Sequence, residues 1–164
     1  MVGSAPGVVK WSLECVREGV ERSGRDDAEV KRILVQTACL DLDKARARDL
    51  LRPNVAGMGY SGRAEWLFAL AGISPPTQPE GFQEPYPDLI HALDWDHAME
   101  ITRYVPDETV DAMMLLGAPD EVVDRDRELD ALGIDAIWWR DTFSWTRPDE
   151  LLEALAADAL PRLK

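Results

Sequence analysis

Cysteine, targeting signals and long apolar runs are all scarce or missing in this chain. Only two of the 164 residues are cysteine. Because Cys15 and Cys39 lack the spacing of a metal or disulfide motif, we expect two buried thiols. No apolar run approaches the roughly eighteen residues that a transmembrane helix needs. The N-terminus also lacks a basic start followed by an apolar stretch, so the sequence predicts a cytoplasmic protein without a signal peptide.

Positive charge is in deficit as well. The 18 basic residues face 31 acidic ones, which gives a formal net charge of −13. Such a surface repels nucleic-acid backbones and anionic lipid, so we expect neither nucleic acid nor a membrane as a partner. With 46% hydrophobic and 30% charged residues, the composition is that of a folded globular chain, and residues 1–164 suit one domain.

Two segments have the apolar character of buried parallel strands, residues 33–38 and 134–139. Asp41 or Asp43 can start a helix after the first strand, and a helix that ends at Gly133 precedes the second. This alternation predicts an α/β fold with right-handed crossovers. Two parallel strands do not make a stable sheet, so this sheet needs further strands.

The middle of the chain has a different character. Residues 74–87 hold five of the eleven prolines, and helices are predicted over residues 63–72, 89–104 and 107–117. Pro53 and the glycines that follow it are expected to interrupt the helix that starts after the first strand.

Three stretches carry a family pattern. They are "GVERSGRDDAEVKRILV" (19–35), "VPDETVDAMMLLGAPDEVVDRDRELDALGIDAIWW" (105–139) and "PDELLEALAADALPRLK" (148–164). Together they resemble the luciferase-like monooxygenase family, and within it the reductases and dehydrogenases that use the deazaflavin coenzyme F420.

The resemblance implies a fold. Members of the family are (β/α)8 barrels, and these stretches look like the helix before the seventh strand, the seventh and eighth strands, and the closing helix. Residues 54–116 look like the family's long insertion. The expected fold class is therefore α/β: a partial (β/α)8 TIM barrel made of its last two β/α units with a helical, proline-rich insertion.

The resemblance also implies a function. An intact relative would transfer hydride to, or monooxygenate, a small organic substrate with coenzyme F420 or FMN as cofactor. The first six strands, which hold much of the cofactor pocket in the family, are not in this chain. We therefore expect a C-terminal fragment that is inactive alone, and no catalytic residue can be assigned.

One position favours a decayed barrel. The inward stripe of the helix over residues 119–132 contains Asp126, where the family pattern favours leucine. A carboxylate on a packed face is costly unless it is paired or solvated. The sequence therefore predicts that this face is no longer fully buried.

Three residues are candidates for cofactor binding, because barrel sites lie at the carboxyl ends of the strands. The guanidinium of Arg140 can bind a phosphate in a forked geometry, or it can pair with Asp141. Thr37 and Ser144 can add hydroxyl contacts, although hydroxyls at loop ends also serve as caps. No metal site is expected, since His91 and His97 lack the spacing of zinc ligands on a helix.

Two other hypotheses remain open. The chain can be a non-catalytic assembly module that completes a split barrel with an N-terminal half-barrel partner or forms a homodimer through open strand edges. It can also be an unrelated acidic helical adaptor, which requires that the two strands do not pair in parallel.

Overall fold

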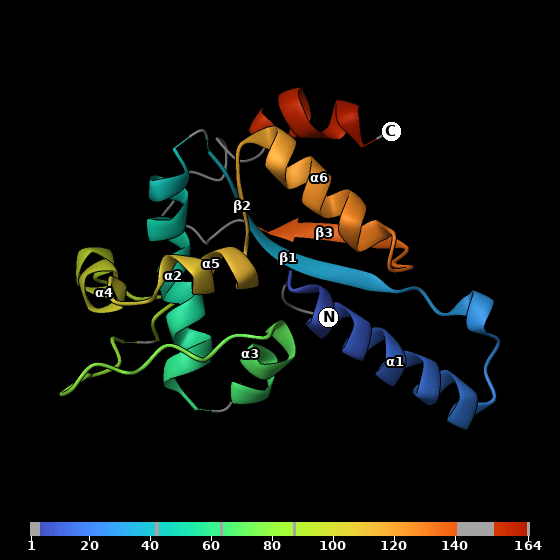
Figure 1. Ribbon diagram of the computed structural model, residues 1–164, viewed down its shortest axis with the longest axis horizontal. Helices are drawn as coiled ribbons and strands as arrows, with labels where there is room; N and C mark the ends of the chain where they lie inside the picture. Colours follow the sequence, from blue (N-terminus) through green and yellow to red (C-terminus); the bar gives the residue numbers. More distant parts are fainter. Residues whose placement is uncertain (1–3, 42, 63, 87, 141–152, 164) are drawn as a thin grey trace.

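The computed structural model describes residues 4–41, 43–62, 64–86, 88–140 and 153–163 (Figure 1). Its elements in chain order are α1 (Pro6–Ser23), η1 (Asp27–Glu29), β1 (Ile33–Leu40), α2 (Lys44–Tyr60), α3 (Glu65–Ala71), α4 (Trp95–Thr102), α5 (Asp107–Met113), β2 (Leu115–Gly117), α6 (Pro119–Asp130), β3 (Ala136–Arg140), η2 (Leu155–Ala159) and η3 (Leu160–Arg162).

The described strands form one parallel sheet in the order β2-β1-β3. The first part of β1 pairs with β3, from Ile33 opposite Ala136 to Thr37 opposite Arg140. The last three residues of β1 pair with β2. Parallel pairing confirms the α/β expectation and rules out the helical adaptor hypothesis, which required that these two strands do not pair in parallel.

The third strand, β2, was not expected. The apolar run through Met113 was predicted to stay helical to Gly117, but α5 ends at Met113 and Met114 is extended, with φ −121° and ψ 158°. Leu115 and the two residues after it then pair with β1. The strand forms because the backbone of β1 supplies its hydrogen-bond partners. A run of three apolar residues is too short to show the periodicity of a strand in the sequence.

Helices α1 and α6 cover one face of the sheet. Val9 of α1 and Leu129 of α6 pack together with Leu34 of β1 in one buried cluster. Figure 1 shows the two helices flanking the β1–β3 pair. This is the helical layer that a barrel strand has on its outer side.

The predicted burial of the thiols was wrong for Cys15, which is exposed, while Cys39 is partly buried. Helix α1 buries Val8 and Val9 against the rest of the molecule, so the stripe that carries Cys15 faces outward. Trp11 on that stripe is 43% exposed and lies against Trp66 of α3, with ring centroids 4.7 Å apart. In the described ranges, no helix combines the length and apolar character needed to cross a membrane.

A second core lies among helices α2 to α5. Helix α2 runs through Pro53 without the expected interruption. Its residues Ala47, Leu51 and Val55 are fully buried there, so packing outweighs the lost backbone hydrogen bond. Helix α4 starts only at Trp95, because Asp88 caps a turn and Asp94 provides the helix N-cap.

Candidate functional site

One face of the β1–β3 pair is open. Side chains alternate between the two faces along a strand. Leu34 of β1 and its register partner Ile137 of β3 face α1 and α6, so the residues next to them in each strand face the other way. On that opposite face Ile33 is 49% exposed and Trp138 is 63% exposed. Its remaining residues are Val35, Thr37, Ala136 and Arg140. In a closed barrel this face is the interior; here Ile33 and Trp138 are exposed on it, whereas Thr37 is buried.

Thr37 and Arg140 meet on this open face. They are register partners in β1 and β3, and Nη2 of Arg140 donates a hydrogen bond to Oγ1 of Thr37 at 3.0 Å. Thr37 is only 5% exposed, so its hydroxyl is a buried acceptor for the guanidinium of Arg140.

Arg140 ends β3, at the carboxyl edge where barrel enzymes place their sites. Two residues earlier, Trp138 projects from the same face and is exposed. The open face therefore offers a cation, a hydroxyl and an aromatic ring close to one another. Such a set can bind a phosphate and an adjoining planar ring.

The third candidate, Ser144, lies outside the described residues, as does Asp141. The hydroxyl contact of the first and the alternative ion pair of the second both remain predictions. The sequence also did not identify which of Trp138 and Trp139 enters the open face; only the register of β3 on β1 decides it.

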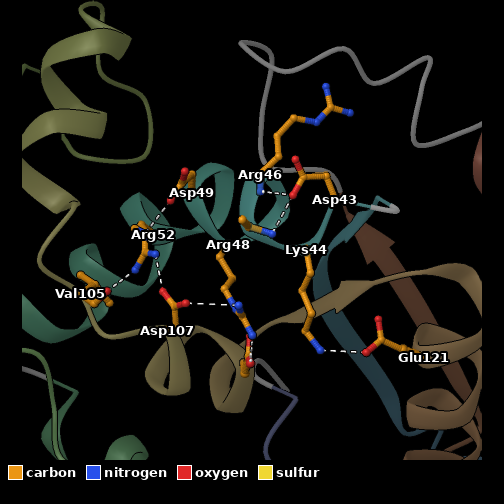
Figure 2. A network of polar contacts seen from close by, with 11 residues as sticks. Asp43, Lys44, Arg46, Arg48, Asp49, Arg52, Val105, Asp107 and Glu121 are labelled. Atoms are coloured by element: carbon orange, nitrogen blue, oxygen red, sulfur yellow. Dashed lines mark hydrogen bonds and ion pairs between the residues drawn. The ribbon is translucent and has the colours of Figure 1, made fainter.

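The carboxyl ends of β1 and β2 are held by an ionic network (Figure 2). The N–H of Asp41 donates to the carbonyl of Gly117 at 3.0 Å, and the side chain of Asp43 caps α2. Lys44 pairs with Glu121 at 2.8 Å. The Lys44 hydrogen bond, together with the N–H of Ala118, lowers the pKa of Glu121.

This network extends along α2. Arg48 forms a bidentate pair with Asp111, with contacts of 2.8 and 2.7 Å, and also contacts Asp107. Arg52 joins Asp107 and the carbonyl of Val105 (Figure 2). Lys44, Arg48 and Arg52 of α2 thus contact α5 and α6. Arg46 pairs with Asp41 instead.

The described ranges contain no group of three acidic, histidine or cysteine residues that could hold a metal ion. His91 Nδ1 lies 2.9 Å from Asp88. That contact belongs to the turn before α4 and assigns His91 a local role.

Asp126 is buried, contrary to the expectation that its face of α6 had become exposed. It is 3% exposed, and burial, aided by the charge of Asp130, raises its pKa to about 7, although the indole of Trp139 opposes this rise. The face therefore stays packed around the carboxyl, with the indole of Trp139 beside it.

Comparison with known proteins gives a consistent pattern. The model of the luciferase-like monooxygenase family matches residues 1–156. The structure is similar to the coenzyme F420-dependent tetrahydromethanopterin reductase from Methanopyrus kandleri, with a TM-score of 0.72 and 19% identity. It is also similar to an F420-dependent secondary alcohol dehydrogenase in complex with an F420–acetone adduct, with a TM-score of 0.60 and 14% identity. No curated protein sequence matches the chain.

Both structural matches include only part of the matched enzyme. They cover 99% of this chain but only 44% and 42% of the two enzymes. The chain therefore spans less than half the length of the structures it matches, and the fold it shares with them is part of a barrel.

Proposed function

Because the chain belongs to the luciferase-like monooxygenase family, we propose that it forms the C-terminal part of an oxidoreductase. The enzyme would use coenzyme F420 or FMN to act on a small organic substrate, by hydride transfer or monooxygenation. Both similar structures are F420-dependent enzymes, which favours F420. The bound cofactor would supply the hydride chemistry, and the protein would supply binding and orientation.

The observation that carries the proposal is the Thr37–Arg140 pair on the open face. A guanidinium can donate to a phosphate in a forked geometry, and the hydrogen bond to Thr37 fixes the orientation of the Arg140 side chain. Ser144, in the segment that follows β3, would add a hydroxyl donor. Trp138, exposed beside this pair, would border the ring system and exclude water from one side of it.

The same face explains why the chain alone should have little or no turnover. A cofactor on this face would have protein on one side only, so water would reach the reacting atoms. The missing wall would come from an N-terminal half-barrel, either in the same polypeptide or in a second one. That half would also cover Ile33 and Trp138.

Binding and turnover can be measured on the purified chain. We expect weak binding of FMN or coenzyme F420 and no steady turnover. Arg140→Gln should weaken binding at least about tenfold, since it removes a charge-assisted, forked contact, and Thr37→Val should weaken it less. The control is Arg103→Gln, because Arg103 is exposed and its guanidinium lies against the neighbouring Tyr104.

Two results would contradict the proposal. Tight binding with steady turnover by the chain alone would show that no further strands are needed. Equal affinities for the wild type and Arg140→Gln would place the cofactor elsewhere.

A second candidate function is a non-catalytic assembly module. Its support is the same exposed face together with the edges of the sheet, because β2 and β3 each pair only with β1 among the described strands. Unpaired edges and exposed Trp138 favour association with another chain. A monodisperse dimer or a defined complex with a half-barrel in size-exclusion with light scattering supports this candidate, and a monomer contradicts it.

A further inference from the structure

A pocket of about 480 Å³ opens on the helical part of the chain, where the proline-rich segment passes the connection between α4 and α5. One part of its lining is the segment 73–77, and the rest is Tyr104, Pro106, Glu108 and Thr109. None of these residues belongs to the Thr37–Arg140 site, so the pocket is separate from the proposed cofactor site. Its volume lies within the roughly 300–1,000 Å³ of pockets that bind small molecules.

The pocket carries a negative charge. Among the described residues, Glu108 is the one charged group in its lining, and it is exposed in the first turn of α5. The neighbouring acids Asp107 and Asp111 are those that pair with the arginines of α2. Glu108 forms no ion pair within the described ranges, so its carboxylate is left for a cation that enters the pocket.

The lining is also poor in hydrogen-bond donors. Three of its residues are proline, which has no backbone N–H (Pro75, Pro76 and Pro106). The N–H groups of Ile73 and Thr109 already donate to carbonyls. By contrast, the carbonyls of residues 74–77 accept no backbone hydrogen bond from the described parts of the chain, so they remain available acceptors. An anion needs donors and fits such a lining poorly, whereas an ammonium group presents three donors.

Tyr104 gives the pocket an aromatic wall. It is 60% exposed, although the guanidinium of Arg103 lies 4.7 Å from the centroid of its ring. Arg103 lines the neighbouring groove beside α4 and not this pocket, and Glu100 in that groove offsets its charge. The side of the ring that borders the pocket is therefore left for a ligand. An aromatic ring beside proline rings suits a planar apolar body.

We propose that this pocket binds a primary ammonium compound with a planar apolar body, an arylalkylamine. The ammonium pairs with the carboxylate of Glu108 and donates its remaining N–H groups to carbonyls of the segment 74–77. The planar body lies against Tyr104 and the proline rings. The charge of Glu108 and the shortage of donors select an amine over an anion, and the aromatic wall selects a ring over a flexible chain.

The test uses 2-phenylethylammonium as the probe, with 2-phenylethanol and 3-phenylpropanoate as neutral and anionic molecules of similar size. Their affinities for the purified chain are measured by saturation-transfer NMR titration near neutral pH. We expect the ammonium compound to bind about three- to fivefold more tightly than the alcohol, which is the gain from a partly exposed ion pair, and the anion to bind most weakly. Equal affinities of the ammonium compound and the alcohol, or tighter binding of the anion, would overturn the proposal.

Variants separate this pocket from the general attraction of an acidic surface. Glu108→Gln should weaken binding of 2-phenylethylammonium about three- to fivefold and leave 2-phenylethanol unchanged. Glu65→Gln is the matched control, because Glu65 is also exposed in the first turn of a seven-residue helix, α3, and does not line the pocket. Equal effects of the two variants would show that only the net charge of −13 attracts the amine, and would overturn the proposal.

A third variant tests the aromatic wall. Tyr104→Ala should weaken binding of both the ammonium compound and the alcohol about two- to tenfold, because each loses its contact with the ring. Unchanged binding of both compounds would overturn the placement of the planar body. A circular-dichroism spectrum checks that each variant folds.

Discussion

Trp138 and Trp139 are consecutive in β3 and lie on opposite faces of the sheet. Trp138 is 63% exposed on the open face, whereas Trp139 packs against the cluster of Ala38, Leu115 and Val122 on the side of α6. One short strand therefore serves two surfaces. The first corresponds to the inner side of a barrel strand, and the second packs beneath α6, next to Asp126.

The exposure of Trp138 predicts association through the open face. Trp138→Lys should move the concentration for self-association upward by at least about tenfold, because burying a large apolar side chain is worth about 1.5–3 kcal/mol. Light scattering should then report a mass near the 18.3 kDa of one chain. Trp11→Lys is the control, since Trp11 is 43% exposed on α1, which packs on the other face of the sheet. Equal effects of the two variants would mean that general apolar exposure, and not this face, drives association.

Asp126 predicts an unusual dependence of stability on pH. Its pKa is raised from 3.8 to about 7 in the folded chain. Between these values the unfolded state has lost the proton and the folded state keeps it, so the contribution of Asp126 to stability falls as pH rises through this window and is constant above it. The loss at pH 8 is of the order of 2–4 kcal/mol, at about 1.4 kcal/mol per pKa unit.

Urea unfolding of Asp126→Leu and the wild type at pH 4, 6 and 8 checks this prediction. The leucine variant should be the more stable one, by a margin that grows from pH 4 to pH 8. The carboxyl groups common to both proteins cancel in this difference, including Asp130 and the ion pairs of Arg127. A margin that does not change with pH would show that Asp126 ionises in the folded state as it does in the unfolded one.

Local pattern in the sequence was enough for much of the fold. The apolar runs of β1 and β3 and the proline-initiated helix α6 were each predicted close to where they lie. In each case the residues that form the element also carry its signal: β-branched and aromatic residues in the strands, and a Pro-Asp-Glu start in the helix.

What the sequence could not provide is non-local. Strand β2 exists because Leu115 finds Ala38 in β1, and a three-residue strand has no periodicity of its own. The Thr37–Arg140 contact depends on a register between strands about a hundred positions apart. The sequence could name both residues as strand-end candidates, but it could not place them side by side. Likewise, a single charge in an apolar stripe does not show whether the stripe stays buried. In the structure the stripe of α6 stays buried around Asp126.

The ionic network on α2 predicts a measurable contribution to stability. Arg48 is 22% exposed and forms a bidentate pair with Asp111, so Arg48→Gln should lower the free energy of unfolding by about 1 kcal/mol. Arg17→Gln is the matched control, because the Arg17–Glu14 pair is 61% and 60% exposed and should contribute nothing measurable. The loss at Arg48 should persist in high salt, as partly buried pairs are screened less. Similar losses for both variants would remove the special role of this network.

Gly117 predicts a strong constraint at the end of β2. Its φ is +123°, a conformation that L side chains rarely adopt, and a Cβ would lie 2.3 Å from Oε2 of Glu121. Glu121 cannot move aside freely, because it accepts from the N–H of Ala118 and pairs with Lys44. Gly117→Ala should therefore lower the free energy of unfolding by about 1–3 kcal/mol.

Gly19→Ala is the opposite case. Gly19 lies inside α1 with nothing within 4 Å of the added carbon, so this change should raise the free energy of unfolding by about 0.5–1 kcal/mol. Urea titrations of the two variants should bracket the wild type. A shift of both in the same direction would show that backbone strain at Gly117 does not govern its tolerance, and that the turn from β2 into α6 can relax around an added side chain.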